Sequence, residues 1–138
     1  MTTTTRSALR QELGLIMGAC KAGTASSAGN AGGTTIVDTT NFTDSDMNAN
    51  FYDHWYALLT SDTYSGQIRR VSSYAGATGT ITVADAFGGQ VASAVTFELH
   101  TNDIADLNNS INRTLPRLFY RTHFYPSLVT DGDMETSG

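Results

Sequence analysis

The sequence has few of the features that would assign a protein to a known class. It holds a single cysteine, Cys20, so no internal disulfide can form. Charged residues make up only 15% of the chain, and its net charge of −5 argues against a general nucleic-acid binder, which is usually basic. No apolar run approaches the roughly 20 residues needed to cross a bilayer. The first residues also lack the basic-then-apolar plan of a secretory signal.

Motifs for catalysis and metal binding are equally scarce. His54, His100 and His123 stand far apart, without the H-x-x-x-H or C-x-x-C spacing of a zinc site. No G-x-S-x-G, P-loop or G-x-G-x-x-G motif is present. We interpret Cys20 as a small buried side chain at a helix end and not as a reactive thiol. The sequence therefore predicts no enzyme, no cofactor and no metal site.

What is present in the middle of the chain, over residues 34–100, is a small β module. Thr80–Val83 alternates cleanly, with Ile81 and Val83 on one face, and in Thr96–Leu99 the residues Phe97 and Leu99 point inward. Glycine-containing turns separate the apolar runs, which favours antiparallel neighbours. We count about five short strands, typical of a small antiparallel barrel or sandwich: Thr34–Val37, His54–Thr60, Gln67–Tyr74, Thr80–Val83 and Thr96–Leu99.

The N-terminal residues 1–22 predict a helix that begins at Ala8 with Ser7 as its cap. Leu9, Leu13 and Ile16 share one face of it, and Met17 extends that face. Gly14 and Gly18 weaken the helix or let another backbone approach closely. Residues 23–33, rich in Gly, Ser and Ala, are expected to be a flexible linker.

Residues 101–126 predict a second helix, which Pro116 should kink. Its apolar stripe comprises Ile104, Leu107, Ile111, Leu115 and Leu118. A basic ridge recurs every fourth residue at Arg113, Arg117 and Arg121, and it suits either a solvated face or a contact with an acidic partner or nucleic acid. The aromatic cluster Phe119, Tyr120, Phe124 and Tyr125 favours an interface. The overall prediction is one α+β domain over 1–126 and a tail at 127–138.

Ser65–Phe87, followed by Thr96–Leu99, resembles a β module of tailed-bacteriophage structural proteins, with the pattern G-Q-x-R-x-[VI]-x-x-[YF]-x-G-x-T-x-T-x-T-[VL]-x-x-[AP]-[FW]. The proline and glycine that often precede the last strand are replaced here by Ala92–Val95. The flanks are similar to neck or head–tail connector proteins, through Leu9–Gly14 and the run Asp103–Arg113, which reads D-I-A-D-L-N-N-S-I-N-R.

The resemblance implies a non-enzymatic virion protein of the neck, assembled in the host cytoplasm. It would be a head–tail adaptor that forms a homo-oligomeric ring, a dodecamer in the family, on the portal, next to tail or nozzle proteins and with possible contact to channel DNA. The predicted partner interface comprises Leu9, Leu13, Ile16, Arg69, Arg70, Arg113, Arg117, Phe119, Tyr120, Arg121, Phe124 and Tyr125. The alternative is an anchoring module of a tail or head fibre, because L-V-T-D-G-D-M-E-T at 128–136 is similar to the start of a carbohydrate-binding jelly roll.

Overall fold

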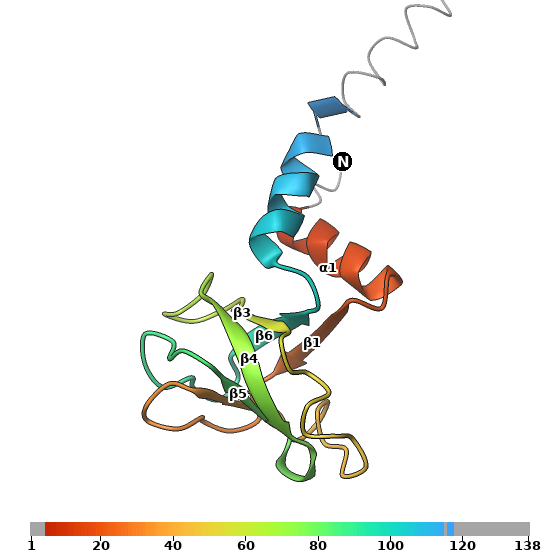
Figure 1. Cartoon of the computed structure of the whole chain (residues 1–138). Coiled ribbons are helices and arrows are strands. Elements are labelled where there is room, and N and C mark those ends of the chain that lie inside the picture. The colour runs from red at the N-terminus through yellow and green to blue at the C-terminus, as the bar shows by residue number, and fades with distance from the viewer. Residues whose placement is uncertain (1–4, 115, 118–138) are drawn as a thin grey trace, which may run out of the picture. The chain divides into compact units, whose positions relative to one another are not determined.

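A computed structural model of the chain describes residues 5–114 and 116–117. The chain divides into two compact units, Met1–Ile104 and Ala105–Gly138, where the sequence predicted one domain over 1–126. The first unit holds helix α1 and a six-stranded antiparallel sheet (Figure 1), and residues 104–114 and 116–117 are helical. The class is therefore α+β. Within the described ranges, no helix is both long and apolar enough to cross a membrane.

Helix α1 spans Arg6–Ile16, so within the predicted helical region 1–22 it begins before the expected Ala8 and ends earlier than expected. Its N-cap is Thr5, whose side-chain oxygen accepts a hydrogen bond from the Ala8 amide, so Ser7 lies in the first turn and is not the cap. Gly18 adopts a φ of 64°, and the Ala19 amide donates to the carbonyl oxygen of Gly14 at 2.7 Å. A left-handed glycine just past the last turn ends the helix in this way.

The sheet has the strand order β1-β6-β3-β4-β5-β2, and every ladder is antiparallel. The sheet does not close, although a single bridge joins Ser27, just after β1, to Val37 of β2. A short 3-10 turn, η1 (Gly76–Thr78), connects β4 to β5. The strands are β1 (Cys20–Thr24), β2 (Thr35–Val37), β3 (Tyr56–Leu59), β4 (Ile68–Ala75), β5 (Thr80–Val83) and β6 (Thr96–His100).

Strand β1 was not expected, since its residues were assigned to the helix end and the linker. The strand β3 is shorter than the predicted His54–Thr60, because residues 51–54 form a turn in which His54 has a φ of 71°. The weak alternation of β4 comes from a bulge between Val71 and Ser73, which lets Val71 and Tyr74 both point inward.

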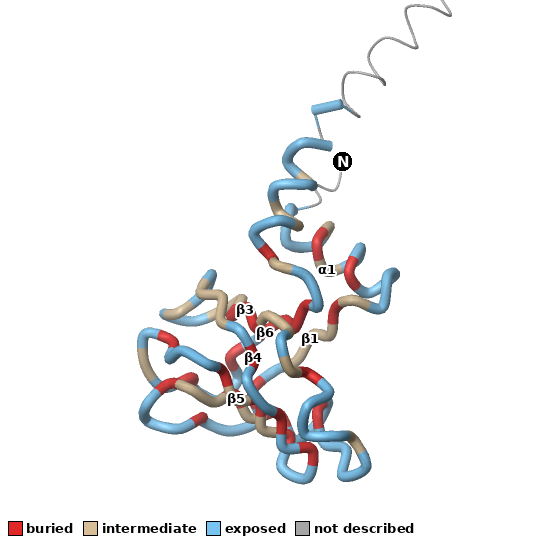
Figure 2. The backbone as a smooth tube through the Cα atoms, viewed as in Figure 1, coloured by how far each residue is buried: buried red, intermediate tan, exposed pale blue. Residues whose placement is uncertain are grey.

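The core lies on one face of the sheet, and Figure 2 marks buried positions along the strands in red. Ile81 and Val83 face it, as the alternation predicted, and so do Phe97 and Leu99. The loops before β3 add Phe42 and Tyr52, whose rings pack at a centroid distance of 5.6 Å. Alternation along β6 therefore sends Glu98 and His100 to the opposite face of the sheet.

Candidate functional site

A buried polar cluster lies where α1 crosses that opposite face. The β1–β6 register sets Cys20 directly opposite His100 and Ala22 opposite Glu98, so Cys20, Glu98 and His100 share one face. Helix α1 supplies Arg10, and all four side chains are buried. Gly14, one turn after Arg10, lies so close that an added Cβ would stand 2.5 Å from Cys20 Cβ. Only a glycine allows the helix to approach this closely.

Arg10 and Glu98 form a buried ion pair. Arg10 Nε donates to Glu98 Oε2 at 3.1 Å, and Nη2 donates to Oε1 at 3.3 Å, a two-pronged geometry. Burial alone would raise the pKa of Glu98. The hydrogen bonds from His100 and Arg10 outweigh burial and hold the pKa of that carboxyl below its ordinary value. Glu98 is therefore ionised at neutral pH and ties α1 to the sheet.

His100 is fully buried between Glu98 and Cys20. Its Nε2 lies 2.8 Å from Glu98 Oε2 and 3.6 Å from Cys20 Sγ. Its Nδ1 is the one buried side-chain nitrogen or oxygen without a hydrogen-bond partner in the described part of the chain. We assign the proton to Nε2, because only that nitrogen has an acceptor. Burial and then the charge of Glu98 raise the pKa of Cys20 to about 11, so its thiol is protonated and a poor nucleophile.

The outer face of α1 is apolar and exposed. Leu13, Ile16 and Met17 are 44%, 78% and 61% exposed, and Leu9 of the same predicted stripe is half-buried. The sequence placed Leu9, Leu13 and Ile16 in a partner interface, and Leu13 and Ile16 are exposed among the residues that the structure describes. Gly14, by contrast, contacts the sheet, which agrees with the close approach considered for it.

The two arginines of β4 differ in their surroundings. Arg69 is held within the chain: its Nε donates to the Ala86 carbonyl oxygen at 2.8 Å, and its guanidinium lies 5.6 Å from the centroid of the Phe87 ring. It covers apolar surface with a long side chain. Arg70 is exposed on the other side of the strand. Of this predicted pair, Arg70 is the one available to a partner.

The remaining predicted interface residues belong to the second unit. Arg113 and Arg117 are exposed there, on helical residues 104–114 and 116–117. Outside the described residues lie Phe119, Tyr120, Arg121, Phe124 and Tyr125. Arg121 of the basic ridge and the whole aromatic cluster are thus outside the residues that the structure describes.

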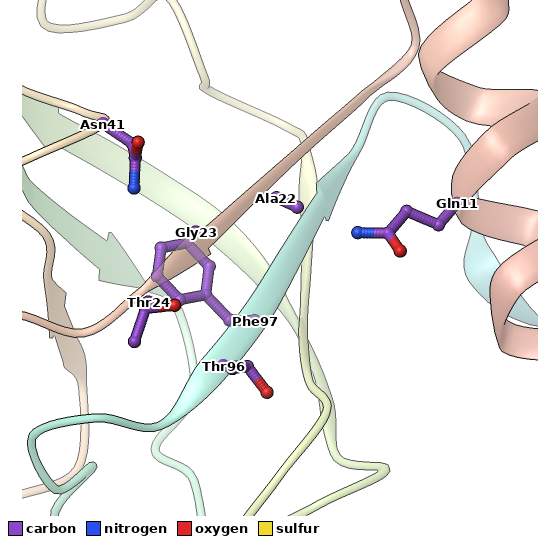
Figure 3. Close-up of a pocket in the computed structure, with 7 residues that line it drawn as sticks. All are labelled: Gln11, Ala22, Gly23, Thr24, Asn41, Thr96 and Phe97. Atoms are coloured by element: carbon purple, nitrogen blue, oxygen red, sulfur yellow. The ribbon is translucent and has the colours of Figure 1, made fainter.

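A pocket of about 290 Å³ lies between α1 and the β1–β6 edge (Figure 3). Gln11 of α1 points toward Ala22 across it, and Thr24 and Asn41 add a hydroxyl and an amide. The lining offers hydrogen bonds, without a carboxylate, imidazole, amine or thiol. The pocket thus combines hydrogen-bonding groups with the apolar side chains of Ala22 and Phe97.

Sequence reasoning missed the buried cluster, although one signal was available. In a strand, Glu98 and His100 are two residues apart and must share the face opposite Phe97 and Leu99. Two titratable side chains on one face near a helix would have drawn attention to it. The place of Cys20 was not predictable, because its strand was read as a helix end.

Comparison of the chain with models of protein families, with curated proteins and with solved structures gave no match.

Proposed function

We propose that this protein is a structural component of a tailed-bacteriophage virion, a head–tail adaptor that forms a ring on the portal and joins the capsid to the tail. The observation that supports the proposal most is the exposed apolar face of α1. Four of the five exposed large hydrophobic side chains in the described residues are Leu13, Leu15, Ile16 and Met17, at the end of this helix. Apolar groups concentrated in this way mark a contact surface.

The helix that carries this face is held in a fixed position by the Arg10–Glu98 pair and by the close approach of Gly14. A surface fixed before binding loses less conformational freedom when a partner arrives. This supports a role in assembly for α1, since a loosely attached helix would have to be ordered first.

We assign the face to a neighbouring copy of this chain. The fifth exposed large hydrophobic is Phe51, whose ring lies 6.3 Å, centroid to centroid, from that of half-buried Trp55. This aromatic patch offers a second apolar surface on the same unit. A contact between two different surfaces of identical chains repeats from copy to copy, and it forms a ring when the rotation between neighbouring copies closes. Exposed Arg70, Arg113 and Arg117 then remain for the acidic portal surface or the channel DNA.

The test is the oligomeric state of the chain, alone and with a portal ring. The chain has a mass of 14.7 kDa, and we expect sedimentation velocity to give a large multiple of it, at least when portal is added. Ile16→Glu should reduce assembly strongly, because a charge cannot be buried unpaired in an apolar contact. Ala8→Glu puts the same side chain at an exposed position of the same helix and should leave assembly intact. A wild-type chain that stays monomeric with and without portal contradicts the proposal.

The alternative function is an anchoring module of a tail or head fibre that precedes a carbohydrate-binding domain. It is favoured by the similarity of residues 128–136 to the start of such a domain. Fibres of this kind are trimeric, so the same sedimentation experiment separates the two functions. Three copies per particle support the fibre anchor, and a larger ring supports the adaptor.

A further inference from the structure

We propose that Cys20, Glu98 and His100 form a binding site for a divalent transition metal ion of the zinc class. They supply one sulfur, one oxygen and one nitrogen, the donor types that such ions take from proteins. Their donor atoms all lie within 4.8 Å of one another, and all three residues are buried. The site goes beyond the adaptor function and does not depend on it.

The spacing of Cys20 and His100 fits such an ion. Bonds of about 2.3 Å to sulfur and about 2.0 Å to nitrogen at a tetrahedral angle set the two donors about 3.5 Å apart. Cys20 Sγ and His100 Nε2 are separated by 3.6 Å. Glu98 Oε2 is nearer, at 2.8 Å from Nε2, because a hydrogen bond joins them. An ion that takes the place of this hydrogen shifts the imidazole proton to Nδ1 and releases the Cys20 thiol proton to solvent. It also needs the carboxylate to withdraw by about 0.6 Å, to the oxygen–nitrogen separation of a tetrahedral site.

The surroundings hold the three donors in place. They stand on the paired strands β1 and β6, whose register fixes Cys20 opposite His100. Arg10 binds Glu98 through two nitrogens, as hydrogen-bond donors commonly do for a ligating carboxylate. The positive charge of Arg10 also lies beside the ion, so we expect weaker binding than at a closed site of four protein ligands. Three protein ligands leave a fourth position for water.

Cobalt(II) titration of the full chain, after treatment with a chelator, tests the site. Because Cys20 is the only cysteine, a thiolate-to-cobalt charge-transfer band in the near ultraviolet can come from no other side chain. We expect such a band to saturate at one equivalent of Co²⁺ and to disappear when Zn²⁺ is added. Cys20→Ala should abolish the band, and His100→Gln should weaken cobalt binding by at least tenfold. His54→Gln is the matched control, since exposed His54 lies 3.3 Å from half-buried Asp53, away from the three donors, and it should change nothing.

Two results overturn the proposal. One is the absence of a charge-transfer band in folded wild-type protein at a large excess of Co²⁺. The other is Co²⁺ binding of unchanged affinity in Cys20→Ala. Circular dichroism in the presence of chelator shows whether each variant folds. If Cys20→Ala does not fold, the wild-type spectrum still decides, because its sulfur signal is unique to Cys20. Assembly is measured separately, so failure of the metal site and failure of the adaptor function are distinguishable.

Discussion

Replacing Arg10 by methionine should destabilise the first unit strongly. The Arg10 and Glu98 side chains are only 7% and 6% exposed, so the substitution leaves a buried carboxylate without its cation. Breaking a buried pair from one side typically costs about 3–5 kcal/mol, a large part of the stability of a domain this size. At about 4 °C or more per kcal/mol, the melting temperature should fall by at least about 12 °C.

Urea denaturation followed by fluorescence measures this loss. Trp55 is the only tryptophan and belongs to the first unit, where its ring packs edge-on against that of Tyr52 at 5.1 Å between centroids. Its emission therefore reports the unfolding of this unit. Arg70→Met is the matched control, because Arg70 is exposed, and it should change the free energy of unfolding by no more than about 0.5 kcal/mol.

A double variant sharpens the test. Arg10→Met combined with Glu98→Gln removes the buried charge but keeps an acceptor for the Nε2 hydrogen of His100. It should recover most of the stability lost in Arg10→Met, because the penalty comes from the unpaired charge and not from the missing contact. A loss below about 1 kcal/mol in Arg10→Met, the range of an exposed ion pair, would refute this reasoning. So would a double variant that is less stable than the single one.

Three further predictions concern single positions. The free energy of unfolding should fall as the pH drops below about 4.3, the ordinary pKa of glutamate. The reason is that the pKa of Glu98 is lower in the folded protein than in the unfolded chain. Urea titrations at several pH values should show that the free energy of unfolding of Glu98→Gln falls less over this range. Gly14→Ala should lower the free energy of unfolding by about 1–3 kcal/mol through overpacking against Cys20, despite the better helix propensity of alanine, and a higher urea midpoint would contradict this. Gly79→Ala should destabilise more than Gly66→Ala by the same measurement, since both have positive φ but only the Gly79 Cβ would meet the carbonyl of Asp38; equal losses would exclude the steric cause.

The parts of the fold that were predictable are those where apolar and polar side chains alternate regularly along the sequence. Thr80–Val83 was placed without error, and β6 to within one residue, because alternation by two leaves no other arrangement. Helix α1 was predicted too long, since its end depends on Gly18 adopting a left-handed conformation, which the residue type permits but does not require.

The strand β1 shows why other parts of the fold could not be predicted from the sequence. Its sequence, Cys-Lys-Ala-Gly-Thr, has little β preference, and it becomes a strand because β6 offers a free edge. Gly23 was read as part of a linker. In the structure a Cβ at this position would meet Asp38 Oδ2 at 2.6 Å and the rings of Phe42 and Phe97 at 2.7 Å. That glycine is a packing requirement, visible only when residues distant in sequence are brought together. The same holds for the Cys20 cluster.

Helix α1 departs from the usual amphipathic arrangement, although its other charged residues, Arg6 and Glu12, are exposed. A helix on the surface of a monomer commonly buries its apolar stripe and exposes its charges. Here Arg10 and Gly14 face the sheet, and Leu13, Ile16 and Met17 face outward. Each face of the helix carries a free-energy cost in a monomer, because the Arg10 guanidinium loses its hydration and the outward apolar side chains remain in contact with water. The first cost is offset by Glu98, whereas the second is relieved only when another surface covers the helix. The arrangement therefore has a physical rationale in an assembled state, and this is the strongest reason to look for the function of this chain in the contacts it makes.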